Sequence, residues 1–242
     1  MKPDRISCLL SVGLLAGSFA GMAVAQNPEL QQKIAEVKQA AAANKQALAQ
    51  YTWVEQTTIS LKGEQKKQEH SQVRLGPDGK PQKQSLDPPA QPAASADSGG
   101  GRGGRVKEHV VEKKKEEYKD YADQIKSLIQ QYLPPEKEML EQAAQKGNIA
   151  LSPQPGAEGQ YKLAITNYVK QGDNMTLLFD KARKSLAGIT IASYLDDPKD
   201  AVNVTVNFTS EPSGLNHISS ETINGVSKQL TIAIQNSNYQ HL

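Results

Sequence analysis

The sequence predicts an α+β protein: a curved antiparallel β-sheet, a half-barrel-like meander, with helices packed on one face. Apolar residues recur at helical spacing in two long segments, and apolar and polar residues alternate through most of the C-terminal half. Short turn signals separate the alternating segments, as expected for strands that pair with their neighbours in antiparallel fashion. The alternation itself predicts one packed face and one solvated face.

Three helices are expected. Residues 29–50 are rich in Ala, Gln, Lys and Leu, contain no Gly or Pro, and follow Pro28, which suits a first helical turn. Residues 106–133 carry an apolar stripe on an otherwise charged helix, which Pro134 and Pro135 end. A short helix over 135–146 should stop at Gly147.

The strand pattern begins at Tyr51, where the hydrophobic period changes from helical to alternating. The residues expected on one face of this strand, with Glu55 interrupting the apolar series, are Tyr51, Trp53, Thr57, Ile59 and Leu61. A turn at 77–80 leads into a short, edge-like strand at 81–86. In the C-terminal half the clearest alternation is that of Val202, Val204, Val206 and Phe208, and Asn224-Gly225 is a strong hairpin signal.

The chain divides into an export signal and one domain. Residues 1–25 read as a signal peptide, with Lys2 and Arg5 before an apolar stretch that ends in Ala23-Val24-Ala25, so cleavage after Ala25 and a periplasmic or secreted location are expected. The alternative is an uncleaved membrane anchor. Residues 26–242 form a single α+β domain, in which 87–105 is a flexible Pro/Ala/Gly-rich loop: fourteen of its nineteen residues are Pro, Ala, Ser or Gly.

Several functional classes lack support in the sequence. The 28 basic and 26 acidic residues nearly balance, which argues against a nucleic-acid binder. Cys8 is the only cysteine and lies in the signal segment, so the exported chain has no disulfide, thiolate or thiol nucleophile. The histidines lack metal-ligand spacing; they are His70, His109, His217 and His241. We therefore predict no catalytic residues, no metal and no cofactor, and a protein that is not an enzyme.

The candidate ligand-binding residues are aromatic and aliphatic. The stripe of the 106–133 helix includes Tyr118, Tyr121, Ile125, Leu128 and Tyr132, and Trp53 stands on the first strand. One interpretation is that the stripe simply packs the helix on the sheet. The other is that the helix covers a concave sheet and that these residues line an apolar cavity for a lipid or acyl chain.

The layout resembles a known family. The order is an N-terminal helix, strands with Tyr51-x-Trp53 and a hairpin bearing Gly63, a helical insert, and a long antiparallel meander over residues 28–242. This is similar to the half-barrel superfamily of periplasmic lipoprotein carriers and mycobacterial lipid carriers, the LolA/LppX-like proteins. The resemblance implies a carrier of apolar ligands, and no functional residue is transferred from it. The C-terminal half is also similar to exported proteins of environmental bacteria.

We therefore expect a non-catalytic exported bacterial envelope protein that binds a lipid or another apolar ligand between sheet and helices, with no stable membrane span after signal cleavage. The alternative is a scaffold module of the cell envelope, in which the sheet or the 106–133 helix binds another envelope protein and no small molecule is held. An enzyme remains a third hypothesis.

Overall fold

The computed structural model describes residues 32, 35, 39, 42–88, 102–211 and 213–242. The predicted signal peptide over 1–25, most of the predicted 29–50 helix and most of the predicted 87–105 loop lie outside these residues. Within the predicted N-terminal helix, residues 42–48 are helical. None of the described helices is long and apolar enough to cross a membrane.

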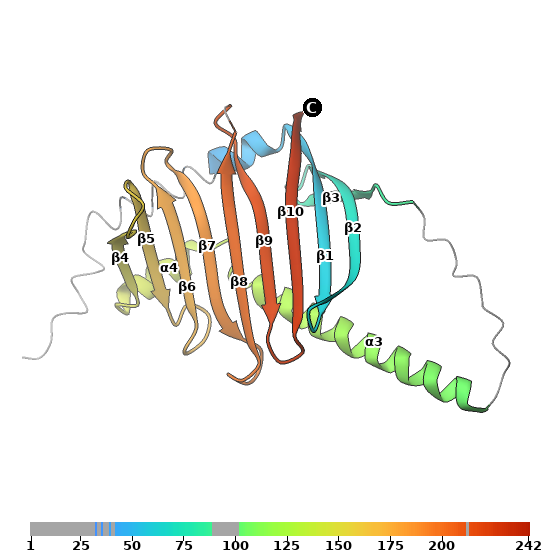
Figure 1. The fold of residues 1–242 in the computed structure, drawn as a ribbon. Helices are drawn as coiled ribbons and strands as arrows, with labels where there is room; N and C mark the ends of the chain where they lie inside the picture. The colour runs from blue at the N-terminus through green and yellow to red at the C-terminus, as the bar shows by residue number, and fades with distance from the viewer. Residues whose placement is uncertain (1–31, 33–34, 36–38, 40–41, 89–101, 212) are drawn as a thin grey trace, which may run out of the picture.

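A single open antiparallel sheet of ten strands forms the body of the protein (Figure 1). This confirms the predicted α+β class with an antiparallel sheet. The strand order is β3-β2-β1-β10-β9-β8-β7-β6-β5-β4. The strands are β1 (Tyr51–Leu61), β2 (Glu64–Leu75), β3 (Pro81–Ser85), β4 (Ile149–Pro153), β5 (Gln160–Thr166), β6 (Asn174–Asp180), β7 (Ser185–Tyr194), β8 (Ala201–Ser210), β9 (Asn216–Gly225) and β10 (Leu230–His241).

The order has one non-sequential neighbour pair, because β1 lies against β10. The N-terminal strands β1–β3 therefore extend the C-terminal meander β4–β10 at its last strand. The chain leaves the sheet at the edge strand β3 and returns at the opposite edge, β4. Two helices make this connection: α3 (Arg102–Ile129) and α4 (Lys137–Gln145).

Helix α3 begins at Arg102, earlier than the predicted start at 106, so the end of the predicted 87–105 loop is helical. The added turn contains Gly103 and Gly104, which cost about 1 kcal/mol each relative to Ala in a helix. Helix ends are the least certain feature of sequence-based assignment. The short strand β4, which ends at Pro153, was not expected from the alternation pattern.

The register of the ladders assigns the two faces of the sheet. In β8 the side chains of Val202, Val204 and Val206 are buried, whereas Asn203 and Thr205 are exposed. Directly opposite residues of antiparallel strands share a face. We call the face that carries Val204 the inner face, and the pairs Val204–Ile223, Ile223–Ile232 and Ile232–Ile59 extend it across β9 and β10 to β1.

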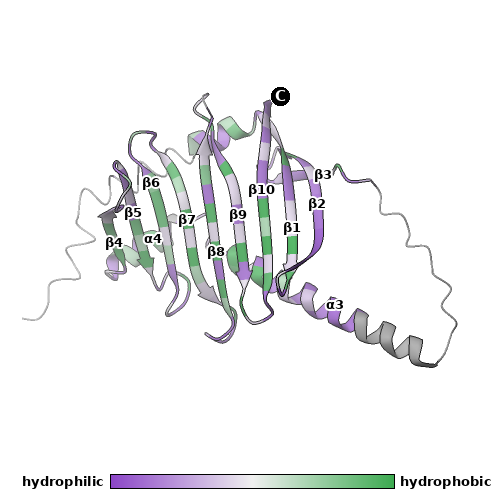
Figure 2. Cartoon of the chain, viewed as in Figure 1, coloured by the Kyte–Doolittle hydropathy of each residue, from purple (hydrophilic) through white to green (hydrophobic). Residues whose placement is uncertain are grey.

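Helix α3 ends at Ile129, before the predicted end at 133, and side chains of its C-terminal half join the buried core of the inner face together with Tyr132 from the turn that follows. Tyr121, Ile125, Leu128 and Tyr132 belong to one cluster with Val202, Val204, Val206, Ile223 and Leu230 of the sheet. In contrast, residues 112–117 of α3 are exposed, and this part of the helix runs out beyond the sheet (Figure 1). Figure 2 shows the same division, because the coloured middle turns of α3 and the strand β2 are hydrophilic whereas β6–β8 alternate.

Candidate ligand site

The structure separates the predicted ligand-binding residues into three places. Tyr121, Ile125, Leu128 and Tyr132 lie together in the core, each less than 5% exposed. Tyr118 is half-buried at the surface, where the ammonium of Lys228 lies 5.7 Å from its ring centroid. Trp53 lies in β1, outside the core cluster that contains the helical stripe.

The helical stripe is in direct contact with the sheet. Gly225 of β9 has no side chain, and a Cβ placed there would lie 2.6 Å from Tyr121 Cε1 and 2.8 Å from Ile125 Cδ1. The Tyr121 hydroxyl donates a 2.8 Å hydrogen bond to Asp200 and accepts a 3.1 Å bond from Ser227. Around Gly225 the helix therefore fills the space against the sheet.

A buried carboxylate lies where the chain leaves α3. Asp173 is 1% exposed and accepts a 2.5 Å hydrogen bond from the hydroxyl of Tyr132, which also lies 2.8 Å from Ser193 Oγ. The backbone N–H groups of Tyr168, Val169 and Lys170 donate three more bonds to the same carboxylate. Burial and the neighbouring Asp173 raise the pKa of Tyr132. With four donors around it, Asp173 organises the 168–173 loop.

The second aromatic group has a different character. The Trp53 ring stacks on Tyr239, with ring centroids 5.5 Å apart, and the His217 ring also stacks on Tyr239, with ring centroids 3.7 Å apart. We call Trp53, Tyr239 and His217 the aromatic cluster. Trp53 is 6% exposed, and its indole Nε1–H has no hydrogen-bond partner. A buried donor without an acceptor costs about 1–3 kcal/mol, so such groups are rare in folded proteins.

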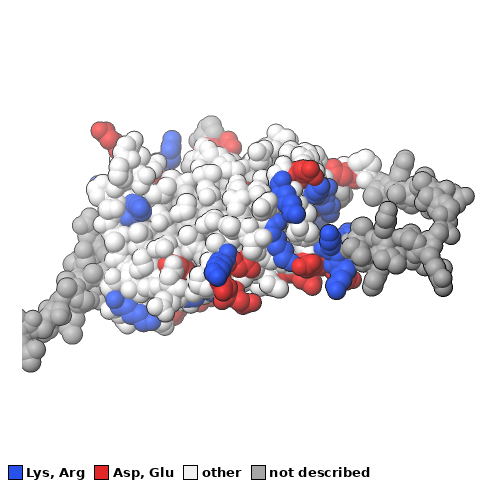
Figure 3. All heavy atoms as spheres, turned by 60° about the horizontal axis from the view of Figure 1, so that its bottom comes forward, with Lys and Arg blue, Asp and Glu red and all other residues white. Residues whose placement is uncertain are grey.

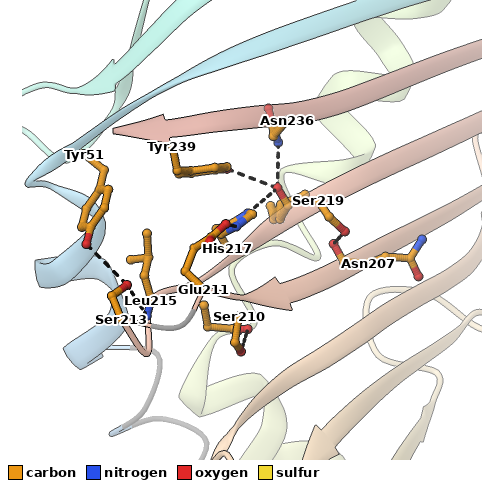
Figure 4. Close-up of polar contacts among 12 residues, drawn as sticks. Tyr51, Asn207, Ser210, Glu211, Ser213, Leu215, His217, Ser219, Asn236 and Tyr239 are labelled. Atoms are coloured by element: carbon orange, nitrogen blue, oxygen red, sulfur yellow. Dashed lines mark hydrogen bonds and ion pairs between the residues drawn. The ribbon is translucent and has the colours of Figure 1, made fainter. Parts of the chain in front are cut away.

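Hydrogen bonds with the start of β9 and with Glu211 hold the Tyr239 and His217 side chains in place (Figure 4). The carbonyl oxygen of Ile218 accepts hydrogen bonds from Tyr239 Oη at 3.2 Å and from Asn236 Nδ2 at 3.1 Å. His217 Nδ1 lies 3.3 Å from the same oxygen, and its Nε2 lies 3.0 Å from Glu211. Both ring nitrogens thus face oxygen acceptors. Burial and the charges of Glu55 and Glu211 raise the pKa of Tyr239.

Two carboxylates lie beside the aromatic cluster on the inner face. Glu55 of β1 faces Asn236 of β10, and Glu221 of β9 faces Ile234 of β10. The two glutamates therefore lie on the two strands that flank β10, opposite β10 residues that are two positions apart. Lys83 of β3 forms an ion pair with Glu55. Burial and then the negative charge of Glu55 raise the pKa of Glu221, against an opposing effect of Lys83. The Oδ1 atom of Asn236 is buried without a partner.

Aliphatic side chains continue this surface toward the core. Ile59, Ile232 and Ile234 share the inner face with the two glutamates, and all three are half-buried. Ile59 and Ile232 pack against the core, whereas Ile234 lies closer to Glu221. We call the whole surface the inner-face platform: Glu55, Thr57, Ile59, Glu221, Ile232, Ile234 and Asn236, bordered by the aromatic cluster. It combines an aliphatic floor with a polar end, which is the composition of many small-molecule sites.

The remaining histidines are dispersed. His70 Nδ1 lies 3.0 Å from Asp87 near the β3 edge, and His241 Nε2 lies 3.2 Å from Gln50 Oε1 close to the C-terminus. In the described part of the chain, no three His, Cys, Asp or Glu side chains are grouped so that they could hold a metal ion. On the face shown in Figure 3, Lys and Arg side chains intermix with Asp and Glu.

A groove lies at the end of the sheet beside the helical residues 42–48. Its volume is about 480 Å³, and its walls come from this helix and from the turns before β7 and β9, including Ala47, Arg183 and Leu215. The backbone N–H of Asn216 donates a 2.9 Å hydrogen bond to Asn44 Oδ1 and thereby joins the helix to β9. The groove is open and mixed in polarity.

Sequence reasoning named Trp53 but missed its partners. Glu55 gave a signal, because it interrupts an otherwise apolar strand face, as a functional carboxylate on a packed surface does. Glu221, Asn236 and Tyr239 gave none, since they stand in polar strands whose neighbours were unknown. Their proximity to Trp53 depends on the β1–β10 pairing.

The chain has a distant structural similarity to a protein of known structure. No protein-family model and no curated protein sequence matches the chain. A DUF1329 family protein from Desulfovibrio piger has a similar structure, with a TM-score of 0.41 and 11% sequence identity over 86% of this chain and 92% of the other. The resemblance to the LolA/LppX-like carriers stays a prediction.

Proposed function

We propose that this protein is a non-catalytic exported protein of the bacterial envelope that binds an apolar ligand on the inner-face platform. The observation that carries the proposal is the indole Nε1–H of Trp53, a buried donor without an acceptor at the border of an aliphatic surface. A ligand that supplies an acceptor there would remove this cost. The export signal and the envelope location rest on residues 1–25 of the sequence.

The inner-face platform suits an apolar ligand better than the contact region between α3 and the sheet does. The predicted lining residues Tyr121, Ile125, Leu128 and Tyr132 are already in contact with core side chains, and Tyr121 and Ile125 leave no room above Gly225. Ile59, Ile232 and Ile234 keep part of their surface exposed. Covering aliphatic surface of this kind contributes roughly 25 cal/mol per Å². The half-barrel with helices on one face, which the sequence predicts, would shape the same surface into a trough.

Mass spectrometry of co-purifying ligands and Trp53 fluorescence together test this proposal. The exported protein is purified without detergent, and its organic extract is examined by mass spectrometry for co-purifying lipids. Trp53 is the only tryptophan in the chain, so its emission reports on this site alone. We expect a bound lipid in the extract and a change in Trp53 emission when the delipidated protein is given alkyl-chain compounds. A protein with no extractable ligand and an unresponsive Trp53 would rule the proposal out.

One observation favours a second function. The exposed residues 112–117 of α3 extend beyond the sheet and present charged side chains of both signs. Such a helix suits a protein partner in the envelope, as in the scaffold hypothesis. If the helix binds a protein partner, reversing the charges of Lys114 and Lys115 should abolish capture of that envelope protein. The amount of lipid extracted from the variant should stay unchanged.

A further inference from the structure

We propose that the ligand of the inner-face platform carries a protonated amine beside its apolar chain, and that Glu221 and Glu55 hold that amine. This inference rests on the proposed function, because it names the chemical class of the ligand at the same site. The carboxylates provide the charge, Asn236 Oδ1 provides a further acceptor, and the Trp53 indole provides a donor for an oxygen near the amine.

The unbalanced charge of the platform is the first argument. The side chain of Glu55 is 11% exposed and already has Lys83 as its ion-pair partner. Glu221 is half-buried, and within the described residues its carboxylate makes no hydrogen bond and no ion pair. A desolvated carboxylate without a partner destabilises the fold unless a proton or a cation neutralises it. A cationic group on the ligand would supply the missing charge.

The unpartnered polar atoms give the second argument. Asn236 uses its Nδ2 on the carbonyl of Ile218, which leaves its buried Oδ1 without a donor. Asn236 lies opposite Glu55, so this acceptor belongs to the same polar end of the platform. Two carboxylates and one amide oxygen are all acceptors, and an ammonium group is a donor with three N–H bonds. A fatty acid would instead bring a second acceptor and a like charge.

The aromatic cluster gives the third argument. Tyr239 lies on β10, the strand next to that of Glu221, and stacks on Trp53 of β1. Trp53 is 6% exposed, and its indole Nε1–H has no hydrogen-bond acceptor. A hydroxyl or carbonyl oxygen of the ligand, close to the amine, would provide this acceptor. The expected class is therefore a long-chain amine or an amino-alcohol amphiphile.

The test compares probes that share one chain and differ in the head group. Dodecylammonium, dodecanol and dodecanoate are titrated below their micelle concentrations into the delipidated full exported chain, with Trp53 emission and calorimetry as readouts. We expect dodecylammonium to bind at least about tenfold more tightly than dodecanol, and dodecanoate to bind most weakly. Equal affinities for amine and alcohol, or tighter binding of dodecanoate, would overturn the amine assignment while leaving the apolar site intact. If none of the three binds, the proposed function itself fails.

Substitutions of single residues test which carboxylate binds the ammonium group of the ligand. Glu221→Gln should reduce dodecylammonium affinity about tenfold or more and leave dodecanol affinity unchanged. Lys83→Met frees Glu55 from its ion pair and should tighten dodecylammonium binding. Glu158→Gln is the matched control, because Glu158 is exposed in the turn between β4 and β5, near the opposite edge of the sheet from the platform. Thermal melts confirm folding of each variant, and an unchanged amine affinity in folded Glu221→Gln would refute the role of this carboxylate.

Discussion

The hydroxyl of Tyr132 donates a 2.5 Å hydrogen bond to the carboxylate of Asp173, a residue 41 positions further along the chain. Both side chains are almost fully buried. The bond ties the end of the α3 connection to the loop before β6, so it fixes the path of the crossover relative to the sheet. The same hydroxyl lies 2.8 Å from Ser193 Oγ of β7.

Replacing Tyr132 by Phe should lower the free energy of unfolding by about 1–3 kcal/mol, because it removes one donor from a buried carboxylate and one partner from Ser193. Urea denaturation followed by circular dichroism measures this loss. Tyr194→Phe is the control, since the Tyr194 hydroxyl donates to the carbonyl of Gln171 at an exposed position. We expect a loss of less than about 1 kcal/mol there. Equal losses in the two variants would contradict a special role for the buried pair.

Gly225→Ala tests the close approach of α3 to the sheet. The added Cβ would lie 2.6–2.8 Å from Tyr121 and Ile125, so one of the two side chains must move. We expect a destabilisation of about 1–3 kcal/mol, the usual cost of an overpacked core. Gly188→Ala is the matched control in β7, where the new Cβ would meet its nearest neighbours at 3.4 Å. A Gly225→Ala protein as stable as Gly188→Ala would show that the helix does not press on β9.

The two halves of α3 should respond differently to truncation. Ile125→Ala removes a side chain that is 1% exposed within the core cluster and should cost about 2–5 kcal/mol. Lys115→Ala changes an exposed position of the same helix and should alter stability by no more than about 0.5 kcal/mol. Differential scanning calorimetry of both variants decides the matter, and similar melting temperatures for the two would be inconsistent with helix–sheet contact at Ile125.

The pH dependence of stability should reveal Glu221. Burial and the charge of Glu55 raise its pKa above the ordinary value of 4.5. Between 4.5 and the raised value, the folded protein retains a proton that the unfolded chain has released, so stability falls as the pH rises through this window and stays lower above it. Each unit of elevation corresponds to about 1.4 kcal/mol.

Glu221→Gln lacks this ionisation. The variant should therefore be more stable than the parent protein at neutral pH. The difference in stability should vanish well below pH 4.5, where the Glu221 carboxyl group of the parent is protonated in both the folded and the unfolded state. Thermal melts over this range measure the difference. Glu158→Gln, at an exposed position between β4 and β5, should show no comparable gain at neutral pH. A constant difference between Glu221→Gln and the parent across the whole range would exclude a raised pKa.

Local hydrophobic patterns in the sequence predicted the helices and strands better than they predicted which strands pair with each other. The alternation of Val202, Val204 and Val206 with polar residues identified both the strand and its buried face, because successive side chains of a strand point to opposite sides. The spacing of Tyr121, Ile125 and Leu128 identified the apolar side of α3 in the same way. The short strand β4 escaped notice, since five residues ending in Pro153 carry too little periodicity.

The candidate site required the tertiary structure. Trp53 and Glu55 were visible in the sequence, but Asn236, Tyr239 and Glu221 reach them only because β1 pairs with β10 and β10 pairs with β9. Backbone hydrogen-bonding groups are the same in every strand, so an isolated sequence does not specify which distant strand becomes the neighbour. That choice depends on side-chain packing across the completed sheet.

The sequence by itself determined the antiparallel α+β class, the buried side of the central strands and the apolar stripe of α3, because each follows from the period of a continuous segment. Only the tertiary structure decided that part of this stripe closes on Gly225 and that an aromatic cluster and two carboxylates meet on one surface. Those outcomes depend on contacts between residues far apart in the chain, whose free energies no local pattern records.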